Sequence, residues 1–197
     1  GAGIGRMTSA FTREFGSVIA ADLDAGFLER CHETVGRFGK VERLRTLEVA
    51  DGRTLDLRAN VGDLAFSYIT LQHCDLDDAL DLSSEAVRVT RPGGKIALNF
   101  RAPAASDAFV VPLGAVVRAM FRLPLVGAWL SQRRFLARLS WQASRLHPDQ
   151  VTGTLATQIT DIEVWTHPTS NLRAFGAIMR SFEGINPRHY WVLATVT

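Results

Sequence analysis

Three glycines, at positions 1, 3 and 5, stand directly before a segment whose apolar residues are spaced three and four apart. Glycine lets the backbone approach a ligand closely, and the first turn of a helix offers N–H groups without a helical partner. Asp22 follows 21 residues after Gly1, at the end of the next short apolar run. A carboxylate in that place can accept hydrogen bonds from both hydroxyls of a ribose. These residues predict a nucleoside-binding site.

The spacing of the glycines narrows the choice of nucleoside. A dinucleotide-binding loop has the pattern G-x-G-x-x-G, and here its third glycine would fall at position 6, which is Arg6. The loop instead reads G-x-G-x-G, and it also lacks the G-K-[ST] ending of a phosphate-binding loop. The pattern argues against NAD and favours a ligand with no pyrophosphate.

His73 ends the stretch LAFSYITLQH and is the candidate catalytic residue, because a histidine there could accept a proton from a substrate. It could equally cap the strand end or bind a backbone carbonyl. The other histidines lack the spacing of metal ligands, so we predict no metal site; they are His32, His147, His167 and His189. The two cysteines, Cys31 and Cys74, are too few for a disulfide scaffold.

Alternating strands and helices must position these residues. Short apolar runs predict buried parallel strands over residues 17–22, 44–51, 64–71 and 95–100. Helical spacing predicts helices over residues 7–15, 27–38 and 77–90, and Arg91-Pro92-Gly93-Gly94 predicts a break before the fourth of these strands. Such alternation with short connections favours a doubly wound, Rossmann-like α/β fold with a mostly parallel sheet.

The pattern changes after residue 101. We predict two or three helices within residues 104–148, a helix over residues 149–156, and final strands over residues 161–166 and 189–197. The last strand is expected to be antiparallel. The whole chain is predicted to form a single domain, with a cofactor-binding half (1–101), a helical lid or insert (102–160) and the final strands (161–197).

The composition excludes several classes of protein. With 197 residues, 47% of them hydrophobic, the chain can bury a core and is not disordered. A net charge of +2 is too small to indicate a nucleic-acid surface. The longest apolar candidate, residues 109–130, contains Arg118 and Arg122, and the first residues do not resemble a signal peptide. We expect a soluble, cytoplasmic protein without a transmembrane segment.

Several separated motifs occur together over residues 1–101: GAGIGRMTSAF, VIAADLD, VADG, LAFSYITLQH and VTRPGGKIALNF. In this order and at this spacing they resemble a class I S-adenosylmethionine-dependent methyltransferase. The resemblance implies that S-adenosylmethionine is the cofactor. The residues that match cofactor-binding positions of that family are Gly1, Gly3, Gly5, Asp22, Leu23, Ala50, Asp51, Gly52, Ser67 and Gln72.

The resemblance also implies a role for each part of this set. The glycine loop would carry the methionine part of the cofactor, and Asp22 would bind the ribose hydroxyls. Asp51 would contact the adenine amino group. Ser67 would lie on the strand under the cofactor, and Gln72 would lie with His73 at its end, near the methyl group.

The family's first strand, with an acidic residue two positions before the first glycine, should precede Gly1. We therefore expect the sequence to be a fragment that lacks this strand at its N-terminus. Because the neighbouring strands would expose unpaired edges, the 197-residue chain alone is expected to be poorly soluble or molten.

Residues 104–148 carry six arginines against the single acid Asp107, with apolar residues between them. Three interpretations remain open: a lid whose arginines face water, a pocket for an anionic acceptor, and a basic face on an anionic membrane. We expect a helical lid that builds the acceptor site, with Trp129 or Trp141 and some of the arginines facing the pocket.

The predicted function is transfer of a methyl group from S-adenosylmethionine to a small-molecule acceptor, which could be anionic. Whether the methyl group goes to oxygen, nitrogen or carbon stays open, as does the oligomeric state. The alternatives are a Rossmann-type NAD oxidoreductase and a non-catalytic regulatory subunit that binds the cofactor.

Overall fold

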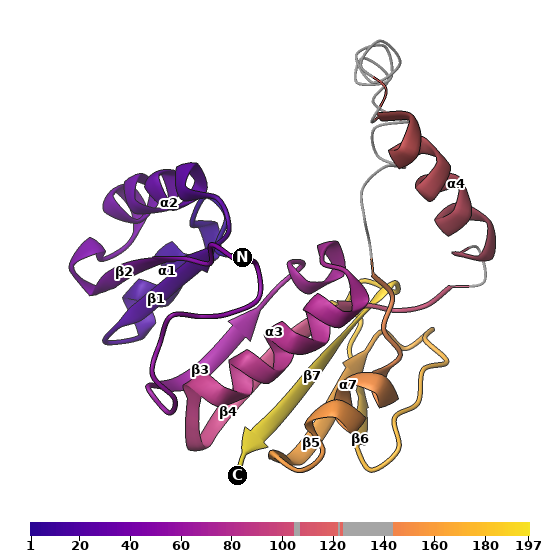
Figure 1. The fold of residues 1–197 in the computed structure, drawn as a ribbon. Coiled ribbons are helices and arrows are strands. Elements are labelled where there is room, and N and C mark those ends of the chain that lie inside the picture. The colour runs from indigo at the N-terminus through magenta and orange to yellow at the C-terminus, as the bar shows by residue number, and fades with distance from the viewer. Residues whose placement is uncertain (105–106, 122, 124–143) are drawn as a thin grey trace.

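A computed structural model describes residues 1–104, 107–121, 123 and 144–197 (Figure 1). The first half contains α1 (Arg6–Glu14), β1 (Val18–Asp22), α2 (Ala25–Phe38), η1 (Val41–Arg43), β2 (Leu44–Glu48), β3 (Gly62–Ser67), η2 (Leu71–His73), α3 (Leu76–Val89) and β4 (Thr90–Arg101). The second half contains α4 (Asp107–Phe121), α7 (Pro148–Leu155), β5 (Ile159–Thr166), β6 (Ile178–Ser181) and β7 (His189–Val196).

The strands form two sheets. β1 and β2 pair in parallel, and a five-stranded sheet has the order β3-β4-β7-β5-β6. Strand β7 is antiparallel to β4 and β5, whereas β3 with β4 and β5 with β6 are parallel. The predicted α/β class with an antiparallel last strand is confirmed. The short strand β6 was not predicted, because all of its residues are exposed and show no alternation.

Period-two alternation divides the five-stranded sheet into two faces. One face carries the main core, with Leu98 and Phe100 of β4 beside Tyr190 and Val192 of β7. Helices α3 and α7 cover this face and contact each other (Figure 1). The alternate positions, such as Trp191 of β7, point to the opposite face.

Several segments differ locally from the sequence prediction, and the second predicted strand ends at Glu48 rather than at Asp51. The predicted break at Arg91–Gly94 lies inside β4: Gly62 pairs with Thr90 but Leu64 with Lys95, so β4 accommodates the extra residues as a bulge. The third predicted strand ends at Ser67 rather than Leu71. There Ile69 takes a left-handed φ of 65°, which ends the extended backbone and leads into η2.

The two sheets meet at their carboxyl ends rather than edge to edge. Ala2 donates its N–H to Ala21 O at 2.9 Å, while Thr70 Oγ1 donates to Gly1 O at 3.3 Å. Deeper along the strands, the ring of Phe11 in α1 packs edge-on against Phe66 of β3, with centroids 4.9 Å apart. The loop at residues 1–5 and helix α1 therefore join the halves, and β1 and β3 do not pair in the described part of the chain.

Helix α4 lies beyond the carboxyl end of β4 (Figure 1). Asp107 at its start forms an ion pair with Arg145 at 2.6 Å, and the two side chains are only 13% and 14% exposed. Trp129, Trp141, Arg122, Arg133, Arg134, Arg138 and the side chain of Arg118 lie outside the described residues, so the lid stays a prediction. Across the described ranges, no helix combines the length and apolar character needed to cross a membrane.

The β1–β2 sheet should open more readily than the five-stranded sheet. Its buried core consists of Ala20, Cys31 and Val35, whereas the core cluster under the five-stranded sheet is several times larger. We expect amide protons of β1 and β2 to exchange at least about tenfold faster than those of β4 and β7, equivalent to about 1.4 kcal/mol in opening free energy. Hydrogen-exchange mass spectrometry measures this. Equal protection in both sheets, with one sharp thermal transition of a soluble monomer, would contradict both this prediction and the expected poor solubility.

Candidate functional site

The glycine loop has a backbone that other residues would adopt only with strain. Gly3 and Gly5 have φ angles of 52° and 83°, in the left-handed region. A Cβ at Gly5 would lie 2.8 Å from Cys31 Sγ, whereas a Cβ at Gly3 would meet no atom within 4 Å. Gly5 is the N-cap of α1, and no side chain caps that helix within the described residues. Open space beside Gly3 and uncapped N–H groups in the first turn together leave room for a ligand.

Asp22 lies at the end of β1, only 9% exposed, and holds the glycine loop in place. Its Oδ2 accepts the N–H of Gly3 at 2.7 Å, and its Oδ1 accepts the N–H of Asp24 at 3.1 Å. A carboxylate can accept about four hydrogen bonds, so each oxygen retains capacity for a hydroxyl donor. The predicted ribose-binding acid is thus in direct contact with the predicted cofactor loop.

The chain after β2 returns to the same edge. Val49 donates its N–H to Asp22 O at 2.9 Å, which ties the ends of β1 and β2 together. Leu23 is 62% exposed, and a Cβ at Gly52 would lie 3.8 Å from its Cδ1. Ala50 is also exposed. Leu23 and Gly52 therefore lie together as a small apolar shelf, and Leu23 directly follows Asp22 in the chain.

Asp51 is exposed and sits in a tight turn. Its Oδ1 accepts the N–H groups of Thr54 at 2.8 Å and Arg53 at 2.9 Å. These hydrogen bonds, with that from Thr54 the larger cause, lower the pKa of Asp51 to about 2. Asp51 is therefore ionised at neutral pH and can accept from an amino group, while its contact with adenine remains a prediction.

The segment after β3 lies against the glycine loop. Ser67 is the half-buried last residue of β3, and Thr70 makes the contact with Gly1 described above. Gln72 is 8% exposed, and its backbone carbonyl oxygen accepts the backbone N–H of Ser144 at 2.7 Å. Its Oε1 is buried without a hydrogen-bond partner among the described residues. A buried oxygen that lacks a hydrogen-bond partner favours binding of a ligand that donates a hydrogen bond to it.

His73 lies in η2 with an exposed side chain, and its Nε2 is 3.3 Å from Gln72 Nε2. The structure thus places His73 at the same edge as Gln72 and Ser67. Its action as a base remains a prediction. Within residues 1–104, 107–121, 123 and 144–197, no group of His, Cys, Asp and Glu could hold a metal ion.

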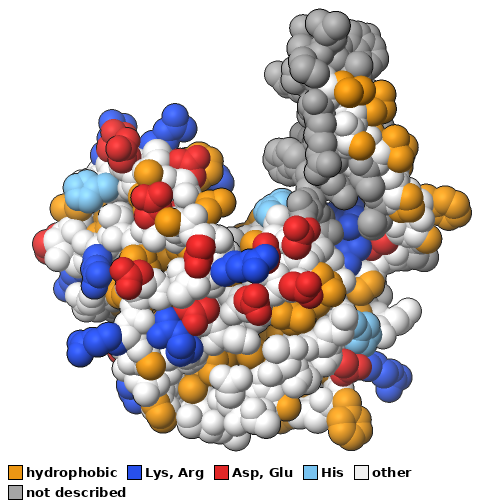
Figure 2. All heavy atoms as spheres, viewed as in Figure 1, with side chains coloured by type: hydrophobic (Ala, Val, Ile, Leu, Met, Phe, Trp, Pro, Cys, Tyr) orange, Lys and Arg blue, Asp and Glu red, His pale blue; other side chains and the backbone are white. Residues whose placement is uncertain are grey.

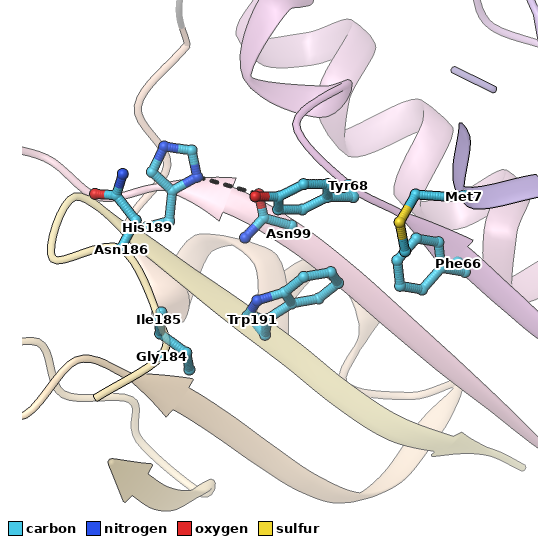
Figure 3. A pocket seen from close by; sticks show the side chains of 9 residues that line it. All are labelled: Met7, Phe66, Tyr68, Asn99, Gly184, Ile185, Asn186, His189 and Trp191. Atoms are coloured by element: carbon cyan, nitrogen blue, oxygen red, sulfur yellow. Dashed lines mark hydrogen bonds between the residues drawn. The ribbon is translucent and has the colours of Figure 1, made fainter. Parts of the chain in front are cut away.

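Sequence reasoning missed a hollow beside this edge, on the sheet face opposite α3 and α7. It has a volume of about 290 Å³ and is lined by Met7, Phe66, Tyr68, Asn99, Gly184, Ile185, Asn186, His189 and Trp191 (Figure 3). The available signal was Asn99, a polar residue inside the apolar strand sequence KIALNF. A buried amide in a central strand needs partners, and those partners lie in segments far away in sequence.

An α/β fold with a glycine loop, a buried acid after the next strand and open space at the strand ends defines a nucleoside-binding protein. Residues 1–98, about half of the chain, match the family model described as "Methyltransferase domain", and this part of the chain belongs to the methyltransferase-domain family. No curated protein sequence matches the chain.

Solved structures with the same fold are distant in sequence. A candidate methyltransferase of Bacillus halodurans C-125 is 18% identical, with a TM-score of 0.59 over 83% of this chain and 62% of its own. An S-adenosylmethionine-dependent methyltransferase of Thermotoga maritima is 14% identical, with a TM-score of 0.55 over 99% and 78%.

A phosphoethanolamine N-methyltransferase of Haemonchus contortus, in complex with S-adenosylhomocysteine, is 23% identical, with a TM-score of 0.55 over 83% of this chain and 33% of its own. The chain therefore spans less than two thirds of the Bacillus and Haemonchus proteins. At these sequence identities, the similarity to the solved structures supports a shared fold and nothing more.

Asp22→Ala should weaken binding of S-adenosylmethionine by about 1.5–3 kcal/mol, because it removes hydrogen bonds to a charged group. The matched control is Asp24→Ala, two residues away, which removes the side-chain cap that accepts the N–H of Phe27 at 3.1 Å. That control should cost about 1 kcal/mol of stability and leave affinity unchanged. Calorimetry and thermal unfolding measure the two effects. Equal affinity of wild type and folded Asp22→Ala would remove Asp22 from the site.

Proposed function

We propose that the protein transfers a methyl group from S-adenosylmethionine to a small-molecule acceptor. The observation that carries this proposal is the contact between Gly3 and the buried Asp22 carboxylate, next to the open space beside Gly3. The NAD alternative is disfavoured because Arg6, at the position of a third loop glycine, begins helix α1 with its side chain exposed.

The residues present fit this donor. Its ribose hydroxyls match the remaining acceptor capacity of Asp22, and its adenine matches the shelf at Leu23 and Gly52, with Asp51 as an ionised acceptor. The amino group of its methionine part can donate to the Oε1 of Gln72, which is buried without a hydrogen-bond partner among the described residues. Gly1, Gly5, Ala50 and Ser67 complete the proposed donor site.

When bound, the cofactor supplies a methyl group on a positively charged sulfur, which is reactive without help from the protein. The chain therefore has to align two reactants and keep water out, and alignment alone can contribute about 7–11 kcal/mol. The glycine loop fixes one reactant against α1. In this proposal His73, which follows Gln72 at the same edge, acts near the other reactant.

The proposal includes a cytoplasmic location. Its support is that Cys31 and Cys74 are both free thiols, as is usual in a reducing compartment. It also includes an electropositive acceptor side, because Arg101 lies near Arg145 and Arg188; burial first, and then Arg145, lowers the pKa of Arg101. The non-catalytic subunit remains the second candidate until transfer is measured.

Calorimetric titration of the chain with S-adenosylmethionine and with NAD separates the enzyme classes. We expect S-adenosylmethionine to bind and NAD to give no heat, because Arg6 stands where a dinucleotide-binding loop has its third glycine. Transfer of a labelled methyl group to a panel of small phenols, amines and carboxylates then separates an enzyme from a binding subunit. Binding of NAD alone would contradict the proposal, and binding of the donor without any transfer would favour the subunit.

The Asp107–Arg145 ion pair tests the lid. Asp107→Ala removes the pair and also the acceptor for the N–H of Ala104 at 2.8 Å, so the start of α4 should loosen. We expect transfer to fall at least about tenfold while donor affinity stays within a factor of two, because a lid excludes water from the reaction. If transfer and donor affinity fell together with the melting temperature, the insert would only stabilise the fold.

A further inference from the structure

Arg101 is a cation that the fold half-buries without a counter-ion. It is the last residue of β4, at the carboxyl edge of the five-stranded sheet. Across the part of the chain that the structure describes, its guanidinium makes no hydrogen bond and no ion pair. A charge that is partly withdrawn from water is stabilised by a partner of opposite sign. Arg101 is therefore suited to binding an anion.

Asp107 is the acid whose charge acts on Arg101, and both of its oxygens are already engaged. Its Oδ1 pairs with Arg145 Nε at 2.6 Å, and its Oδ2 accepts the N–H of Ala104 at 2.8 Å. Residues 108–148 contain no Asp or Glu, so this segment cannot supply another carboxylate. A bound anion would complete the charge balance at Arg101.

Further basic groups border Arg101. The backbone carbonyl of Arg188 accepts the N–H of the residue after Arg101 at 2.8 Å, and His189 lies opposite Arg101 in the pairing of β4 with β7. Burial is the main cause that lowers the pKa of Arg101, followed by the charge of Arg145. Asp107 acts in the opposite direction, and Arg188 acts in the same direction as Arg145. An anion at this edge would gain from several positive groups at once.

A series of contacts places this edge beside the glycine loop. Ile69, next to the residue that contacts Gly1, donates its N–H to Asn99 Oδ1 at 3.3 Å. The same oxygen lies 3.2 Å from His189 Nδ1. Asn99 and Arg101 are two residues apart in β4 and therefore share a face of the sheet. An acceptor bound at Arg101 would thus lie at the same edge as the proposed donor.

The acids and the cations of this edge lie in different places. Asp22 and Asp51 follow β1 and β2, whereas Arg101 and His189 lie at the adjoining ends of β4 and β7 (Figure 1). The proposed donor has hydroxyl and amino groups that can donate to carboxylates. A guanidinium instead presents parallel N–H groups that match the oxygens of a carboxylate or a phosphate. The two parts of the edge therefore favour reactants of different charge.

We propose that Arg101 binds the carboxylate or phosphate group of an anionic acceptor, at the carboxyl edge of the sheet beside the loop proposed for the donor. The inference rests on the proposed function, for which it names the class of acceptor. Arg101 acts through binding alone, since no bond forms or breaks at its guanidinium. Another atom of the same acceptor receives the methyl group.

His189 reports on the charge at Arg101. Burial is the main cause that lowers the pKa of His189 below its usual 6.5, and the charges of Arg101 on β4 and His73 in η2 act in the same direction. Arg188 precedes it in the chain. Figure 3 shows its ring beside Asn99 and turned away from the aromatic side chains of the hollow. An anion bound at Arg101 would offset the positive charge and raise the pKa of His189.

The first test titrates the full chain with inorganic phosphate and with sodium acetate at constant ionic strength. Either anion should raise the midpoint of His189 in NMR titrations, and Arg101→Gln should weaken this binding at least about tenfold because it removes charged hydrogen bonds. The matched control is Arg91→Gln at the other end of β4. Arg91 already has a carboxylate partner, Asp63 at 2.6 Å, so its loss should leave anion binding within a factor of two.

The second test measures transfer to acceptors that differ only in the anion. Hydroxybenzoate and hydroxyphenyl phosphate are compared with phenol, and aminobenzoate is compared with aniline. Wild type should favour the anionic member of a pair at least about tenfold in kcat/KM. Arg101→Gln should remove this preference by raising KM, whereas Arg101→Lys should keep part of it because it retains the charge without the planar fork. A merely structural role would lower transfer to both members equally.

Three outcomes would overturn the inference. The first is no effect of phosphate or acetate beyond that of chloride at equal ionic strength. The second is equal weakening in Arg101→Gln and Arg91→Gln, which would reflect net charge alone. The third is lost affinity for S-adenosylmethionine in Arg101→Gln, which would assign Arg101 to the carboxylate of the donor. A response to phosphate alone, or to acetate alone, supports the inference and identifies the anion.

The two proposals fail separately. If wild type does not bind S-adenosylmethionine, the proposed function is wrong, and the phosphate and acetate titrations still judge Arg101. If donor binding is normal but none of the acceptors is methylated, the same titrations decide the inference. If Arg101→Gln does not fold, Arg101→Lys takes its place, and anion binding equal to that of wild type would then count against bidentate recognition by Arg101.

Discussion

The hydrogen bonds to the Asp22 carboxylate are the constraint on which the candidate site depends. One oxygen accepts the N–H of Gly3 and the other accepts the N–H of Asp24. The same short segment thus fixes the glycine loop before α1 and the turn that leads into α2. The carboxylate keeps further lone pairs for a ligand. Loop, strand end and ligand site are therefore one hydrogen-bonded unit.

In the five-stranded sheet, alternate side chains along a strand face either the core or the hollow. Along β7, Tyr190 and Val192 enter the core under α3 and α7, while His189 and Trp191 point to the hollow on the other face. The Tyr190 hydroxyl donates to Leu146 O at 2.9 Å inside the core and anchors the segment before α7 there. The view in Figure 2 shows charged side chains spread over the surface of the body, with apolar side chains among them. The side chains that line the hollow thus lie on strands whose other face is packed into the core.

Elements with strong local signals were predicted well. Helix α2 begins at the cap Asp24 and buries Leu28, Cys31 and Val35 at helical spacing, so its bounds were nearly correct. The end of β3 was predicted too late, because Tyr68–Leu71 is as β-prone as the strand before it. There the buried amide of Asn99, 30 residues away, binds Ile69 and helps hold the turn. Strand β6 was missed because its pairing with β5 imposes no pattern on its exposed side chains.

The sequence by itself determined the α/β class, the glycine loop and the acid that meets it, because glycine spacing, strand-end acids and apolar periodicity are local properties. It predicted Asp51, Gln72 and His73 at strand ends, whereas Asp51 lies in the turn after β2 and the other two lie in η2 after β3. Only the tertiary structure decided that the strands form two sheets joined at the glycine loop. It alone brought Asn99 to His189, 90 residues away in sequence. A buried amide takes its partners from whatever the fold places beside it, and no local spacing records that choice.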